Sequence, residues 1–76
     1  MECTTISGPD PNKPCVLPFK FRGETYTSCT TVDNPPGDTT AWCSTKVDNS
    51  SDHVGDQGNW GNCEPKCQSN PFGKLI

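Results

Sequence analysis

Residues 15–30, CVLPFKFRGETYTSCT, carry the clearest pattern in this chain. Apolar and polar side chains alternate from Phe19 to Thr27 on either side of Gly23. A period of two is typical of a β-strand with one buried face, and the central glycine favours a tight turn. The stretch therefore predicts a short hairpin that turns at Arg22-Gly23-Glu24.

The rest of the chain shows weaker signals of the same kind. Two segments, 41–45 and 59–63, are interpreted as a second pair of short strands. Loops rich in turn-forming residues are expected at 33–38 and 48–58, and residues 7–14 form a polar entry punctuated by prolines. Because no internal repeat or linker divides the sequence, we expect a single domain.

Composition decides how such a chain can fold. Leu, Ile, Val and Phe account for eleven of its 76 residues, and six residues are cysteine. A core this small cannot offset the entropy of folding without cross-links. The cysteines therefore predict a disulfide-stapled, secreted, extracellular module. The same composition excludes a large enzyme core, a transmembrane segment and a long amphipathic helix.

Charge narrows the possible partners. The formal net charge is −3, with no basic stripe of the kind that nucleic-acid binding requires. No apolar run reaches the roughly 18 residues of a membrane span, and none follows Met1 as a signal segment, which predicts a mature or excised domain. Asn49-Ser50-Ser51 is a sequon for N-glycosylation in a polar stretch.

Catalytic and metal chemistry find little support in the sequence. The single histidine, His53, lies in a loop with Asp52 and Asp56, and every cysteine is needed for a disulfide, so we predict no enzyme. Paired zinc ligands two to four residues apart would be expected at both ends of a structural site, but only Cys63 and Cys67 have that spacing. The acidic loop fits no calcium-binding spacing, and no cofactor is predicted. Six cysteines allow fifteen pairings, among which arithmetic does not choose.

Three fragments together resemble one known family. They are residues 15–30, Trp42-Cys43-Ser44-Thr45 and Trp60-Gly61-Asn62-Cys63. In this combination they resemble the fibronectin type II module, a relative of the kringle, over residues 15–63. The resemblance implies a small disulfide-rich fold, mostly β and irregular, with two short antiparallel two-stranded sheets around a cluster of aromatic side chains.

The resemblance also implies a disulfide pattern and domain limits. The implied pairs are Cys15–Cys43 and Cys29–Cys63, which leaves Cys3–Cys67 to join the two ends as an addition to the family pattern. Residues 48–59 look like an insertion. The module is expected to occupy residues 1–67, followed by a flexible tail at 68–76.

Family members hold collagen, gelatin or choline phospholipids on an exposed aromatic surface, whose positions here match Phe21, Trp42, Trp60 and His53. We therefore expect an extended extracellular protein or peptide ligand, collagen-like or otherwise, oriented by loop groups such as Asp33 and Asp48. One alternative is choline phospholipid, although a phenol that would bind its phosphate is missing. Another is inhibition or regulation of a secreted serine protease. Its candidate bonds are Arg22-Gly23, Lys46-Val47 and Lys66-Cys67.

Overall fold

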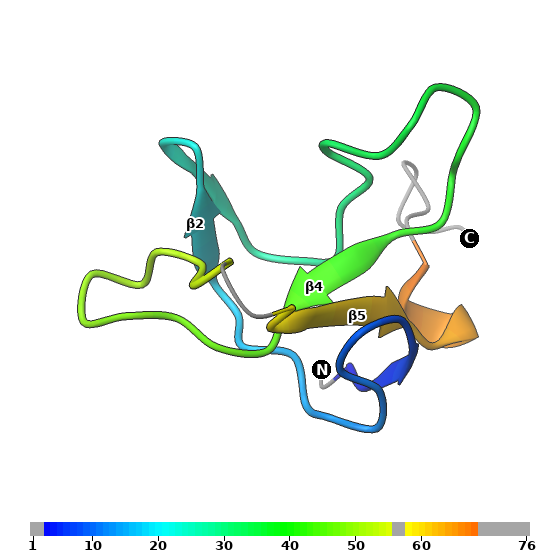
Figure 1. The fold of residues 1–76 in the computed structure, drawn as a ribbon, viewed down its shortest axis with the longest axis horizontal. Coiled ribbons are helices and arrows are strands. Elements are labelled where there is room, and N and C mark those ends of the chain that lie inside the picture. The colour runs from blue at the N-terminus through cyan, green and yellow to red at the C-terminus, as the bar shows by residue number, and fades with distance from the viewer. Residues whose placement is uncertain (1–2, 56–57, 69–76) are drawn as a thin grey trace.

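The computed structural model describes residues 3–55 and 58–68, which form two small antiparallel sheets connected by long loops (Figure 1). The hairpin sheet pairs β2 with β3, and the larger sheet has the strand order β1-β5-β4. A 3-10 turn, η1, follows β5. The element bounds are β1 Thr5–Ser7, β2 Phe19–Phe21, β3 Glu24–Tyr26, β4 Trp42–Ser44, β5 Trp60–Cys63 and η1 Pro65–Cys67.

The hairpin predicted from residues 15–30 is confirmed as β2 and β3. Phe21 pairs with Glu24, so the connection is a two-residue turn formed by Arg22 and Gly23. Both residues have positive φ, 54° and 86°. Such a turn matches the right-handed twist of the flanking strands. The alternation then places Phe19 at 0 % exposure in the core, while Phe21 is half-buried.

The strands expected at 41–45 and 59–63 are confirmed as β4 and β5, and β1 adds a third strand to their sheet. We predicted two strands in this sheet. In β1 the polar side chain is the buried one, since Thr5 is fully buried and the apolar Ile6 is 53 % exposed. Thr5 is satisfied because its hydroxyl donates to the Asp10 carbonyl at 2.7 Å and accepts the Lys13 amide at 2.9 Å. Alternation of apolar and polar residues could not reveal this strand.

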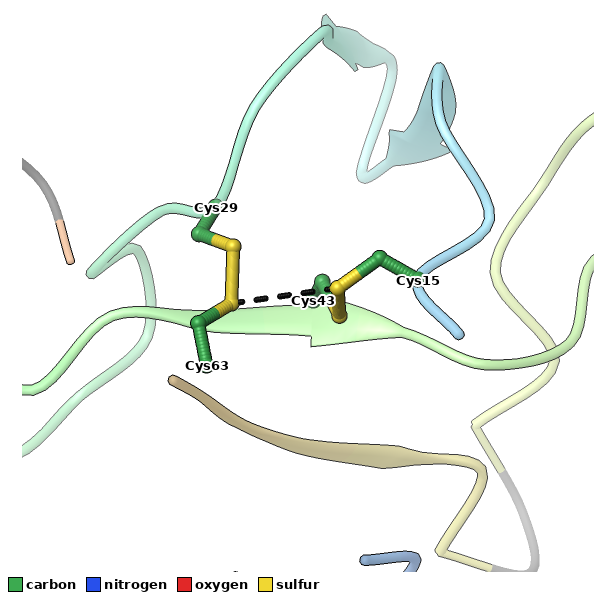
Figure 2. Close-up of side chains that lie close together, drawn as sticks. All are labelled: Cys15, Cys29, Cys43 and Cys63. Atoms are coloured by element: carbon green, nitrogen blue, oxygen red, sulfur yellow. Dashed lines mark hydrogen bonds between the residues drawn. A yellow bond between two sulfur atoms is a disulfide. The ribbon is translucent and has the colours of Figure 1, made fainter. Parts of the chain in front are cut away.

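Disulfides form the centre of the molecule. They join Cys15 to Cys43, Cys29 to Cys63 and Cys3 to Cys67, the pairs that the family resemblance implies. Figure 2 shows the first two packed together on the β4–β5 sheet, with the Sγ atoms of Cys15 and Cys63 3.9 Å apart. These four sulfurs lie within 4.8 Å of one another and are bonded in two disulfides, which excludes them as metal ligands in this state.

The C-terminal boundary differs from the sequence-based expectation at Gln68, which we assigned to a flexible tail. Its Oε1 accepts the amide of Ala41 at 2.7 Å, and its Nε2 donates to the carbonyl of Cys63 at 2.7 Å. Gln68 therefore belongs to the folded module. The remainder of the expected tail, residues 69–76, lies outside the described residues. Within the described part of the chain, no helix is long and apolar enough to cross a membrane.

Candidate functional site

A pocket of about 370 Å³ opens between the hairpin, the larger sheet and the loop that precedes β4. In Figure 1 the hairpin and this loop project from the same side of β4. Aromatic side chains form one part of the lining, and acidic and amide side chains form another. The lining residues are Phe21, Val32, Asp33, Asn34, Pro35, Asp38, Trp42, His53, Gly55, Trp60 and Asn62.

The four residues expected to form an aromatic surface all lie on this pocket. The ring of Phe21 meets Trp42 edge-on, with centroids 5.5 Å apart, and Trp42 in turn meets Trp60 at 6.0 Å. His53 lies 5.5 Å from Trp42 and 5.8 Å from Phe21. Edge-to-face contacts of this kind add stability beyond the burial of area. The rings therefore support one another and form a continuous wall.

The two tryptophans take different positions in that wall. Trp42 is only 5 % exposed, and its indole N–H donates to the carbonyl of Val32 at 2.8 Å. Trp42 is therefore mainly a core residue, and its expected contact with a ligand stays a prediction. Trp60 and Phe21 are half-buried and line the pocket, so they present more ring surface to a ligand.

His53 is fixed by backbone and side-chain contacts. Its amide donates to the carbonyl of Lys20, which attaches the loop after β4 to β2. Its Nδ1 lies 2.7 Å from Ser44 Oγ, and that hydroxyl donates to the Lys46 carbonyl. With the Ser44 hydroxyl assigned as donor to Lys46, the matching tautomer of His53 carries its hydrogen on Nδ1 and has Nε2 as an acceptor. Burial lowers the pKa of His53 from its ordinary value of 6.5.

The contact between His53 and Ser44 superficially resembles a base beside a nucleophile. Ser44, however, is 0 % exposed, so its hydroxyl cannot meet a substrate. The pair instead fixes the orientation of the imidazole ring within the aromatic wall.

The charged rim of the pocket consists of Asp33 and Asp38 in the loop at 33–38, and Arg22 of the hairpin turn pairs with Asp33 from outside the lining. Arg22 Nη1 lies 3.2 Å from Asp33 Oδ1, and the Arg22 guanidinium carbon lies 5.0 Å from the centre of the Phe21 ring. Asp38 accepts the amide of Thr40 at 3.0 Å through Oδ1. Asn34 holds the loop closed by donating to the Thr40 carbonyl at 2.7 Å. Hydrogen bonds within the loop thus shape this side of the pocket.

Some lining residues could not be found from the sequence. Asn34 and Asp38 belong to no motif, and their only signal was their place in a run of turn formers. Asn62 lies in the Trp60-Gly61-Asn62-Cys63 fragment, but nothing in that fragment marked it as a lining residue. Asp48, which we expected to orient a ligand, is not on the pocket. Its Oδ1 instead accepts the amides of Ser50 and Asp52 within its own turn.

Residues 48–59, which we expected to be an insertion, are described except for 56–57. Asn49 is exposed, as a glycosylation site requires, and its modification stays a prediction. A parallel β-bridge between the backbones of Lys20 and Asp52 attaches this segment to β2. Asp56 lies outside the described residues.

The basic residues of the candidate protease bonds are Arg22, Lys46 and Lys66, and none of them lines the pocket. Arg22 lies in the positive-φ turn and Lys66 in η1, so neither belongs to an extended loop.

Taken together, the three disulfides, the two small sheets and the aromatic pocket define a stapled β module built to present a ligand surface. Comparison with known families is consistent with this description, since the model of the fibronectin type II domain matches residues 15–63. The chain belongs to the fibronectin type II domain family. This domain is a non-catalytic binding module, and disulfide-rich examples are typically extracellular.

Two curated relatives show the same segment within far larger proteins. The chain is 45 % identical over 42 residues to matrix metalloproteinase-9 of the dog, Canis lupus familiaris, a match that covers 55 % of this chain and 6 % of that protein. It is 41 % identical over 44 residues to the 72 kDa type IV collagenase of the chicken, Gallus gallus, covering 58 % of this chain and 6 % of that protein. The matched segment thus spans about one-sixteenth of the length of either relative.

Proposed function

We propose that this chain is a secreted module that binds an extended, collagen-like protein segment in the aromatic pocket. The observation that carries the proposal is the gathering of Phe21, Trp60 and His53, all half-buried, on one pocket of about 370 Å³. Half-buried rings keep apolar surface available to a ligand, whereas core rings do not.

The chemistry of an extended ligand fits such a pocket. Proline-rich segments are pre-ordered in the polyproline II conformation, and they dock into aromatic grooves at little cost in entropy. The chicken relative is named as a type IV collagenase, which supports collagen as the ligand class. In the binding mode proposed here, Phe21 and Trp60 contact the ligand, while Trp42 supports both rings from behind.

Choline phospholipid is a weaker candidate because the pocket offers no phenol. The only tyrosine, Tyr26, packs on Phe19 at 5.5 Å and is not part of the pocket lining. A quaternary ammonium could still contact the indoles, but its phosphate would lack a tyrosine donor. An extended peptide requires no such donor.

The test uses immobilised gelatin and the variant Phe21→Ala. Loss of this half-buried ring should weaken binding about tenfold or more, which corresponds to about 1.4 kcal/mol. Backbone NMR shifts away from the pocket should stay native, because Phe21 lies outside the fully buried core. Ile6→Ala is the matched control, since Ile6 is an exposed apolar residue on β1 that does not line the pocket.

Two results would overturn the proposal. One is the absence of gelatin binding by the unmodified chain, with a clear response instead to phosphorylcholine or to a trypsin-like protease. The other is gelatin binding by Phe21→Ala at unchanged affinity.

Should this variant fail to fold, NMR of the unmodified chain tests the proposed surface instead. Gelatin should then shift the indole N–H signal of Trp60 more than that of Trp42, and equal or absent shifts would contradict the proposed surface.

A further inference from the structure

The charges on the pocket are all of one sign. Asp33 and Asp38 are the charged residues of the lining, and no lysine or arginine is among the described residues that form it. Asp33 is paired with Arg22, and this is the one salt bridge in the described part of the chain. The carboxylate of Asp38 accepts a backbone amide but has no cationic partner there. The rim therefore keeps an uncompensated negative charge beside aromatic rings.

Arg22 shows how a cation is bound at this edge of the pocket. Its guanidinium lies over the face of Phe21 and at the same time contacts the Asp33 carboxylate at 3.2 Å. A cation above a ring face is attracted by the ring, and a carboxylate strengthens its placement. Both side chains of the pair are at least half exposed, so a ligand cation can compete with Arg22 at this edge.

We propose that the pocket selects ligand segments that carry a positively charged side chain, arginine in particular, with the cation held between Asp38 and the rings of Phe21 and Trp60. This inference rests on the proposed function and specifies its ligand. Arg22 then acts as an internal competitor that neutralises Asp33. Planar guanidinium suits both parts of the site, because it stacks on rings and donates in a fork to carboxylates. The neutral imidazole of His53 does not oppose the cation.

The experiment compares two synthetic peptides. Both are glycine- and proline-rich hexapeptides; one has a central arginine and the other has citrulline, which is neutral and nearly isosteric. We expect the arginine peptide to bind about fivefold more tightly in low salt, and this preference should shrink at high ionic strength. Binding is followed by tryptophan fluorescence and by NMR shifts of the unmodified chain.

Three variants locate the effect. Asp38→Asn should reduce the preference for arginine to about twofold or less, whereas Arg22→Gln should increase it because Asp33 is released. Asp48→Asn is the matched control. It changes the net charge by the same amount, lies away from the pocket, and keeps the oxygen that accepts the amides of Ser50 and Asp52. The preference of Asp48→Asn for the arginine peptide should equal that of the unmodified chain.

The outcomes separate this inference from the function on which it rests. Equal affinity for the two peptides, or an equal loss in Asp38→Asn and Asp48→Asn, overturns the cation site. If gelatin still binds in that case, the proposed function stands without it. If neither gelatin nor the arginine peptide binds, both proposals are wrong.

Discussion

Gln68 is expected to stabilise the module more than its place at the end of the fold suggests. The amide of Ala41, a residue with 0 % exposure, donates to Gln68 Oε1, and Gln68 Nε2 donates to the carbonyl of Cys63. Each such bond contributes about 1 kcal/mol, and an unsatisfied buried amide costs about 1–3 kcal/mol. Gln68→Ala should therefore lower the free energy of unfolding by about 2–4 kcal/mol.

The assay is urea unfolding followed by tryptophan fluorescence. Gln68→Glu is the matched variant, because a carboxylate oxygen can still accept the Ala41 amide but cannot donate to Cys63. Its second carboxylate oxygen replaces Nε2 and would face the Cys63 carbonyl, so its loss should be at least as large as that of Gln68→Ala. A loss below about 0.5 kcal/mol in Gln68→Ala would refute the argument, since surface substitutions commonly have effects of that size.

Three further predictions concern the sheet, the turn and pH. Gly61→Ala should destabilise by about 1–3 kcal/mol in the same assay, because a Cβ would lie 2.7 Å from the Thr5 side chain; unchanged stability would show that β1 moves freely. Arg22→Asn should stabilise by about 0.5–1 kcal/mol, since asparagine tolerates the positive φ and an exposed ion pair contributes little; a lower unfolding midpoint would contradict this. Because the folded pKa of His53 lies below its ordinary 6.5, stability is fully present above pH 6.5 and falls as pH drops toward the folded pKa. His53→Gln should remove this slope, and an identical pH profile for the variant would rule out His53 as its source.

The fold was predictable where local chemistry and long-range structure agree. The hairpin follows from alternation around Arg22-Gly23, which places Phe19 and Phe21 on one face of the strand. The pattern does not tell how deeply each ring is buried, and the structure buries Phe19 fully and Phe21 only in part. The strand β1 was not predictable, because burial of the Thr5 hydroxyl depends on acceptors and donors in a later loop. Gln68 was missed for a similar reason. Its partners are Ala41, which precedes β4, and Cys63 of β5, and the contact between Gln68 and Ala41 exists only once the chain has folded.

The candidate site could also be predicted only in part. Family resemblance indicated Phe21, Trp42, Trp60 and His53, and the fold brings all four to one pocket. It could not distinguish the buried indole of Trp42 from the half-buried one of Trp60, because both tryptophans stand close to a cysteine in sequence. It also could not supply the acidic rim, since the position of Asp38 relative to the rings depends on how the loop closes through Asn34.

The parts of the chain outside residues 15–63 converge on one strand, β5. The strand β1 pairs with β5, with Thr5 opposite Cys63. The Cys3–Cys67 disulfide joins the segment before β1 to the turn η1 after β5. Gln68 donates to the Cys63 carbonyl. Trp60 begins this strand and lines the pocket. Because these contacts order β5 in the free chain, ligand binding costs less conformational entropy. We therefore expect loss of the Cys3–Cys67 bond to weaken ligand binding through Trp60, even where the two inner disulfides keep the module folded.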